Sequence, residues 1–172
     1  LRKRGFEVLF MTDGVDQWAV EGLGEFEGKA LVNAMEADLK VGAADADKPQ
    51  DEAAAAQDSA AIAPLLARCK EVLAAFVSEV RVSERLTDSP VCLVLPKGGL
   101  PAHIERLIRP QQQDLPHKQH ILELNPNHPL LIRLRDELAR DPQSEKLKDW
   151  IEMLYDQALL TEGSPLPDPA RF

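Results

Sequence analysis

The most regular pattern of apolar and polar positions lies between Asp141 and Thr161. Seven residues recur there at alternating spacings of three and one, which places them on one face of an α-helix. They are Leu147, Trp150, Ile151, Leu154, Tyr155, Ala158 and Leu159. Asp141 with Pro142 suits an N-cap and first turn, and Gly163 suits a C-terminal stop. The pattern predicts an amphipathic helix over this range.

A second helical pattern lies just upstream, and Asn127 is a suitable cap for it. Its apolar positions are Leu130, Leu131, Leu134 and Leu138. Because few residues separate the two patterns, we expect an antiparallel helical hairpin. Burying about ten such side chains represents roughly 15–30 kcal/mol of gross stabilisation, which is an upper bound. A hairpin alone covers only part of this surface, so a sheet or a second chain must cover the rest.

The first 37 residues hold short apolar segments separated by glycine and acidic residues. The run Phe6–Thr12 is bounded by Gly5 and Asp13-Gly14, which predicts a buried strand. Asp16–Leu23 is expected to form a short helix or turn that carries Trp18. Ala30–Met35 is expected to form another short strand.

Residues 38–61 are rich in Ala, Asp, Glu and Gln, a composition that cannot build a core but suits a helix. We interpret them as a connector whose second half joins the next helix. The apolar stripe of that helix comprises Ile62, Leu65, Leu66, Cys69, Val72, Leu73 and Phe76. Pro64 should kink the helix or mark its first turn.

Three strands are predicted between this helix and the hairpin. Val80–Leu86 and Val91–Leu95 flank a turn at Thr87–Pro90 and are expected to pair with each other. Gln119–Leu124 is the third strand, and Leu100–Arg109 is a short amphipathic segment. The expected fold class is α/β of the α+β kind, dominated by helices, with a small three-stranded sheet and helices packed against it.

Charge and hydropathy exclude several kinds of partner. The chain has 172 residues with 29 acidic and 20 basic side chains, and its net charge of -9 would repel a nucleic-acid backbone. No apolar run is long enough to cross a bilayer. Cys69 and Cys92 lie in apolar patterns and are expected to be free buried thiols, which indicates a reducing, cytoplasmic setting.

The sequence offers no convincing catalytic or metal site. His117 and His120 have a spacing that metal sites use, but no cysteine lies near them. His103 and His128 are isolated, and a surface or capping role is expected for them. Neither glycine pair, at 22–24 or 98–99, has the pattern of a phosphate-binding loop. We therefore expect no catalytic residue, no metal and no cofactor in this chain.

The unusual features are apolar. Trp18 stands in a polar, glycine-rich neighbourhood, and Leu100, Ile104, Leu107 and Ile108 form a short stripe. Such residues either pack in a core or form an exposed surface that binds another protein.

Several separate motifs, in order, resemble the C-terminal region of the heat shock protein 90 chaperone family, most closely its bacterial members. They are RLTDSP at 85–90, LELNPNHP at 122–129, LYDQALL at 154–160 and LPDPARF at 166–172. The opening block is similar to the end of that family's middle domain, through GFEVLFMTD at 5–13, DQW at 16–18 and EFEGK at 25–29. The resemblance covers nearly the whole chain except the alanine-rich connector.

The resemblance implies three segments and an ATP-driven, homodimeric protein-folding chaperone. Residues 1–37 would end the middle domain, 38–61 would be the connector, and 62–172 would be the C-terminal dimerisation domain. The abrupt ends of the sequence predict a piece of a longer protein. The ATP and Mg²⁺ sites and the hydrolysis would then lie upstream of Leu1, so this piece is expected to be no enzyme.

The resemblance also implies two surfaces. Trp18, Leu100, Ile104, Leu107 and Ile108 would contact partly folded client proteins, although Pro101 and Pro110 depart from a long helix there. The helical hairpin would form a dimer bundle, with Leu147, Trp150, Ile151, Leu154, Tyr155, Ala158 and Leu159 at the interface. Only the first turn of the family's last helix is present, at Asp168–Phe172. Co-chaperones are further possible partners.

Two alternatives stay open at this stage. One is a purely structural dimerisation module without client contact. The other is a small enzyme domain that uses His117, His120 or His128 with nearby carboxylates.

Overall fold

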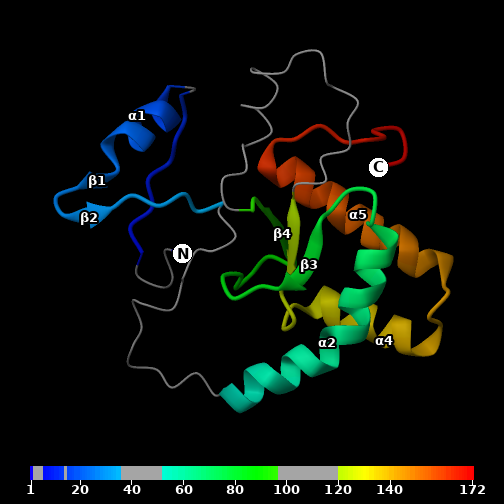
Figure 1. Ribbon diagram of the computed structural model, residues 1–172. Coiled ribbons are helices and arrows are strands. Elements are labelled where there is room, and N and C mark those ends of the chain that lie inside the picture. Colours follow the sequence, from blue (N-terminus) through cyan, green and yellow to red (C-terminus); the bar gives the residue numbers. More distant parts are fainter. Residues whose placement is uncertain (2–5, 14, 36–51, 97–119) are drawn as a thin grey trace.

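The computed structural model describes residues 1, 6–13, 15–35, 52–96 and 120–172, with the side chains of residues 17, 21 and 52–60 left aside. The elements, in chain order, are α1 (Asp16–Leu23), β1 (Glu25–Phe26), β2 (Lys29–Ala30), α2 (Glu52–Val72), β3 (Glu79–Val82), β4 (Val91–Val94), β5 (Ile121–Leu124), α4 (Pro129–Arg140) and α5 (Glu145–Glu162). Figure 1 shows how they are arranged. The mixed, helix-rich architecture that the sequence predicts is confirmed.

The three-stranded sheet has the order β3-β5-β4. Strand β5 pairs in parallel with β3, with Val80 opposite Leu122, and antiparallel with β4, with Leu93 opposite Leu122. The prediction that the first two strands pair with each other is therefore wrong. All four residues of β5 are buried, whereas β3 begins at an exposed residue. The strand buried along its whole length takes the centre of the sheet, where both of its edges are paired.

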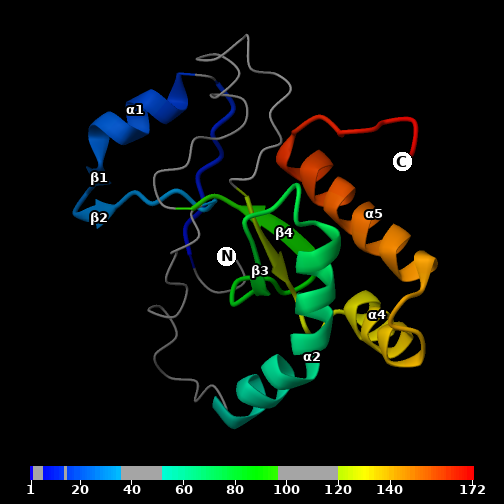
Figure 2. The same ribbon diagram turned by 45° about the vertical axis from the view of Figure 1, so that its right-hand side comes forward.

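Helices cover one face of this sheet. Helix α2 packs on β3, α5 packs on β4, and α4 contacts both helices. Figures 1 and 2 agree that these helices lie on one side of the sheet and that α1, β1 and β2 lie on the other. The core between sheet and helices contains fully buried leucines, among them Leu65, Leu73, Leu122, Leu124, Leu131, Leu134 and Leu147. This core is the main source of stability, because apolar burial is the dominant favourable term in folding.

Helix α2 begins at Glu52, so the second half of the alanine-rich connector is helical as predicted. Pro64 lies inside the helix, which excludes a position in its first turn. A proline there removes one backbone hydrogen bond and bends a helix, and Figure 2 shows α2 changing direction along its length. Beyond the helix, the Phe76 ring packs 5.5 Å from the ring of Tyr155, centroid to centroid.

The caps of the C-terminal helices differ from the prediction. His128, not Asn127, caps α4: its Nδ1 accepts from the backbone N–H of Leu130. Helix α5 begins at Glu145 after Ser144, not at Asp141. Asp141 ends α4 instead, because its side chain accepts from the N–H of Gln143 and so forms a turn between the helices.

The predicted stop of α5 is confirmed. Gly163 adopts a φ of 89°, and its N–H bonds to the carbonyls of Leu159 and Leu160. This is the left-handed conformation that glycine accepts at a helix C-terminus without strain.

The N-terminal block holds α1, as predicted, and a small hairpin of β1 and β2. Glu27 and Gly28 both have positive φ at its tip, as a type I′ turn requires. The prediction of a strand at Phe6–Thr12 is wrong, since these residues are irregular and Leu9 and Phe10 are largely exposed. Of the expected strand Ala30–Met35, only Ala30 belongs to β2. An apolar run becomes a strand only where a neighbour supplies backbone partners.

Candidate functional site

The apolar stripe of α5 lies mainly inside the chain's own core. Six of its seven residues are buried, and Trp150 is half-buried with the Lys146 ammonium 4.8 Å from its ring centroid. The sheet and α2 supply the cover that the sequence requires for this surface. The predicted use of these seven residues in a dimer interface stays a prediction. The opposite face of α5 is the one that is left exposed.

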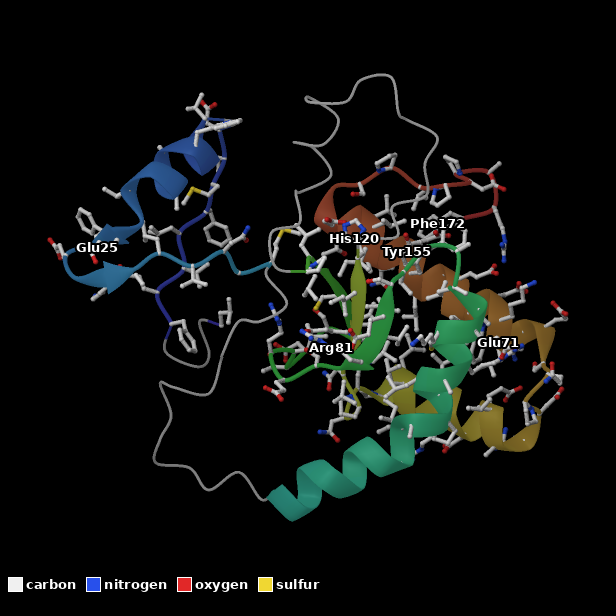
Figure 3. The ribbon with its side chains drawn as sticks, in the orientation of Figure 1. Glu25, Glu71, Arg81, His120, Tyr155 and Phe172 are labelled. Carbon is white, nitrogen blue, oxygen red and sulfur yellow. The ribbon has the colours of Figure 1, made fainter. Side chains whose placement is uncertain are left out.

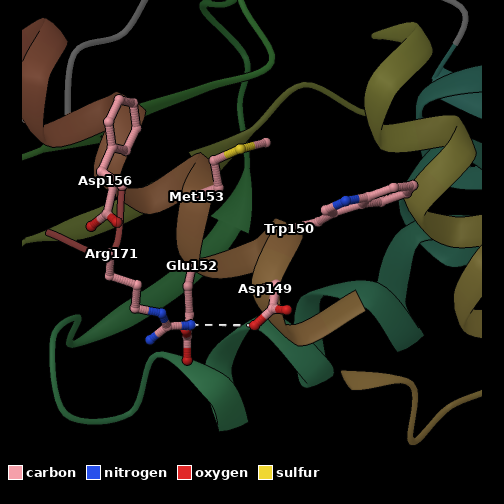
Figure 4. Close-up of a pocket in the computed structure, with 7 residues that line it drawn as sticks. Asp149, Trp150, Glu152, Met153, Asp156 and Arg171 are labelled. Atoms are coloured by element: carbon pink, nitrogen blue, oxygen red, sulfur yellow. Dashed lines mark hydrogen bonds and ion pairs between the residues drawn. The ribbon is translucent and has the colours of Figure 1, made fainter. Parts of the chain in front are cut away.

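That opposite face carries a groove of about 270 Å³. Figure 4 shows it between α5 and the segment that ends at Phe172. Its lining residues are Asp149, Trp150, Glu152, Met153, Asp156, Arg171 and Phe172. We call this the α5 groove. Met153 is 48% exposed and Phe172 is 60% exposed, and Leu160 is exposed further along the same helix.

The α5 groove is mostly acidic at its rim. Arg171 forms an ion pair with Glu152 and lies 3.4 Å from the Asp149 carboxylate, which ties the C-terminal segment to the helix. Burial raises the pKa of Asp156, and the nearby Asp168 carboxylate raises it further. The groove thus combines three carboxylates and one guanidinium with the apolar side chains of Trp150, Met153 and Phe172.

The N-terminal block exposes a second group of apolar side chains. Trp18 on α1 is 63% exposed, so this residue of the predicted client site does lie at the surface. Other large apolar residues of the block are exposed as well: Leu9, Phe10, Met11, Val15, Leu23, Phe26 and Val32. The remaining predicted client residues, Leu100, Ile104, Leu107 and Ile108, fall in 97–119, outside the residues that the structure describes.

A buried ionic network, which the sequence analysis missed, lies on the sheet face away from α5. Glu123 of β5 has a side chain only 3% exposed, and the guanidinium groups of Arg81 and Arg85 approach its oxygens to 2.7 and 3.0 Å. Ser83 donates a hydrogen bond of 2.9 Å to the same carboxylate. Figure 3 shows where Arg81 lies beside the strands. The polar alternation at 81, 83 and 85 was the available signal, but it equally suits a solvent-exposed face.

The described histidines have partners within the fold. His120 is buried at the start of β5, and its Nε2 lies 3.0 Å from the Glu162 carboxylate at the end of α5. His128 caps α4, which confirms the expected capping role. His103 and His117 lie outside the described residues. Within the described ranges, no group of three or more His, Cys, Asp or Glu side chains is placed to hold a metal ion.

Both cysteines are free thiols, as predicted, although Cys92 is only half-buried. Burial raises the pKa of Cys69 to about 12. Burial also raises the pKa of Cys92 to about 12, with the Glu123 carboxylate as the next contribution. Neither thiol is therefore an activated nucleophile, because only the thiolate reacts.

In the part of the chain that the structure describes, no helix is long and apolar enough to cross a membrane.

Comparison with known proteins gives one consistent result. The family described as Hsp90 protein matches residues 1–172 of the chain. The chain is 51% identical over 174 residues to the "Chaperone protein HtpG" of Myxococcus xanthus, a match that covers 100% of this chain and 26% of that protein. It is 47% identical over 171 residues to the protein of the same name from Geobacter metallireducens, covering 99% and 26%. The corresponding protein of Nitrosococcus oceani is 42% identical over 171 residues, again covering 99% and 26%. The chain thus spans 26% of the length of these relatives.

Proposed function

The chain belongs to the Hsp90 protein family, and we propose from this that it is the dimerising and client-contacting part of an ATP-dependent chaperone. In this proposal, residues 1–37 form the C-terminal end of the middle domain and residues 62–172 form the dimerisation domain. Residues 38–61 connect the two. The observation that carries it is the combination of a well-packed C-terminal core with large apolar side chains left exposed at two places. Exposed apolar surface of this kind is typical of protein-binding sites.

We place the dimer contact on the outward face of α5. The buried stripe from Leu147 to Leu159 holds the helix on the sheet and so fixes the orientation of this face. Met153, Leu160 and the half-buried Trp150 then remain available to a second copy. A contact between identical faces would follow two-fold symmetry, as in most homodimers.

Light scattering over a concentration series tests the dimer. Met153→Asp and Leu160→Asp place a charge at the proposed contact and should lower the measured molar mass toward that of one chain. Ala139→Asp is the control, because Ala139 is an exposed residue of α4 and lies outside the proposed contact on α5. Equal molar mass for all four proteins, or one-chain mass for the unaltered chain at every concentration, would refute this placement.

The client surface is proposed to include Trp18, together with the predicted Leu100, Ile104, Leu107 and Ile108. The support is the 63% exposure of Trp18 among other exposed apolar side chains. Trp18→Ser should weaken suppression of the aggregation of a heat-denatured reporter protein. Ile132→Ser is the control, since Ile132 is exposed on α4, away from α1. If Trp18→Ser and Leu107→Ser suppress aggregation as well as the unaltered chain, a purely structural dimerisation module is the better description.

No covalent chemistry is proposed for these residues. ATP and Mg²⁺ binding, and any co-chaperone contact that depends on them, are assigned to other parts of the whole chaperone. A cytoplasmic location is proposed on the free state of Cys69 and Cys92, since reducing compartments keep thiols unpaired. Nucleotide titration of the chain tests the first assignment: saturable ATP binding would overturn it.

A further inference from the structure

Two turns from distant parts of the sequence meet at the sheet. Asn33 shapes the first, because its side-chain oxygen accepts from the N–H of Met35 at 2.9 Å. Ser83 shapes the second, because its Oγ accepts from the N–H groups of Arg85 and Leu86, both at 3.2 Å. Figures 1 and 2 show the segment after β2 reaching the sheet beside β4. Each turn is thus built locally before it meets the other.

The contact between the turns consists of two hydrogen bonds to backbone carbonyls. Arg85 Nη1 donates to the carbonyl of Ala34 at 2.9 Å. The N–H of Leu95, just past β4, donates to the carbonyl of Met35 at 2.8 Å. These bonds join the N-terminal block to the C-terminal domain across a sequence separation of more than 50 residues.

Arg85 is held for this contact from its other side. Its Nε lies 3.0 Å from Glu123 Oε2, and its Nη2 lies 3.4 Å from Glu123 Oε1. The side chain of Arg85 is 10% exposed and that of Glu123 is 3% exposed, so water screens the pair little. Ser83 donates to the same carboxylate, which fixes the turn that carries Arg85. A planar guanidinium can make both sets of bonds at once, whereas an ammonium group lacks this fork.

We propose that Arg85 is a positioning residue that ties segment 33–35 to the C-terminal sheet and so sets where the N-terminal block sits. Glu123 and Ser83 orient the guanidinium, and the Ala34 carbonyl is what it holds. The tie can be released without dismantling the sheet, because the Ala34 bond uses a different guanidinium nitrogen from those facing Glu123. Arg81 shares the carboxylate through its own guanidinium, since its Nε and Nη2 lie 3.1 and 2.7 Å from Glu123 Oε1, within the sheet.

Amide hydrogen exchange tests the tie, with Leu95 as its reporter. Arg85→Lys keeps a positive charge near Glu123. Because an ammonium group lacks the guanidinium fork, it cannot bond to Glu123 and to the Ala34 carbonyl in the same geometry. It should speed exchange of the Leu95 amide by about tenfold or more, the loss expected for a charge-assisted hydrogen bond. The Asn125 amide, which bonds to the carbonyl of Pro90 inside the domain, should keep its rate.

Arg81→Lys is the matched control. It alters the same carboxylate environment, so it should affect the overall urea midpoint about as much as Arg85→Lys does. It should leave Leu95 exchange close to that of the unaltered chain. The proposal is overturned if both variants speed Leu95 equally, or if Arg85→Lys speeds Leu95 and Asn125 by the same factor.

Discussion

His120 and Glu162 lie 3.0 Å apart, both almost fully buried, and join the start of β5 to the last residue of α5. Ser164 donates to the second oxygen of the same carboxylate at 3.2 Å. On the other side, the His120 carbonyl accepts from the N–H and the hydroxyl of Ser78, just before β3. One residue therefore connects the central strand to the end of the last helix and to the neighbouring strand.

Removing the acid should weaken this connection measurably. Glu162→Ala takes a buried acceptor from the His120 ring and from Ser164, and we expect a loss of about 1–3 kcal/mol in the free energy of unfolding. Glu162→Gln keeps one acceptor oxygen and should lose less. Urea unfolding measures both, and Gln157→Ala, at an exposed position of the same helix, is the control. A Glu162→Ala midpoint no lower than that of the control would contradict the pair's structural role.

Truncating a side chain should lower the free energy of unfolding much more on the buried face of α5 than on its exposed face. Leu154 is 2% exposed, so Leu154→Ala leaves a cavity and should lower the free energy of unfolding by about 2–5 kcal/mol. Met153, the preceding residue, is 48% exposed. Met153→Ala should change the free energy of unfolding by less than about 1 kcal/mol under dilute, monomeric conditions. Similar losses for the two variants would mean that the helix is rotated relative to the sheet.

Stability should fall in alkaline solution. The pKa of Cys69 rises from 9.0 to about 12 on folding, so below about pH 9 the thiol is protonated in both states and its contribution is fully present. Between about pH 9 and 12 the unfolded thiol ionises while the folded one does not, which favours unfolding. Cys92 has the same window, and Tyr155 has one from 10.0 to about 12.

Urea unfolding under reducing conditions at pH 8, 9 and 10 measures this effect. Cys69→Ala should flatten the decline above pH 9, whatever its constant packing loss, whereas Met153→Ala should not change the slope. An unchanged slope in Cys69→Ala would show that this thiol does not contribute.

Alanine substitution at two glycines separates the effect of backbone conformation from the effect of steric room for a side chain. An added Cβ meets no atom within 4 Å at either Gly163 or Gly22. Gly163 has a φ of 89°, so Gly163→Ala should destabilise by about 1–2 kcal/mol. Gly22 lies in α1 without a positive φ, so Gly22→Ala should be neutral or stabilising by up to about 1 kcal/mol. Thermal unfolding with equal midpoints for the two variants would argue against the left-handed C-cap.

The sequence predicted the elements of the C-terminal domain well because their signals are local. The 3.6-residue period of α5, the stop at Gly163 and the apolar run of β5 each depend on a few neighbouring residues. Strand order is not set by neighbouring residues, since it depends on which strand can be paired and buried along both edges. The caps also differed by one to a few positions, because several polar residues near a helix start can serve.

The site was less predictable. The periodicity from Leu147 to Leu159 identifies the apolar face of α5, but it does not tell whether a sheet or a second chain covers that face. Likewise, the carboxylate of Glu123 stands in an apolar run, and only the fold brings Arg81 and Arg85 to it. In the N-terminal block, the apolar run at Phe6–Thr12 has no strand beside it in the described residues, so its pattern did not produce the expected element.

The central place of β5 has a consequence for how the chain acquires its structure. Among the described residues, the sheet partner of both β3 and β4 is β5, and Glu79 pairs with Ile121, which lies 42 positions later (121 − 79). During synthesis, neither earlier strand has its sheet partner until residues 121–124 have been made. Contacts at such separation close slowly and leave apolar strand edges open meanwhile. The sheet should therefore assemble late and in one cooperative step, with the arrival of β5 as the event that commits the domain to fold.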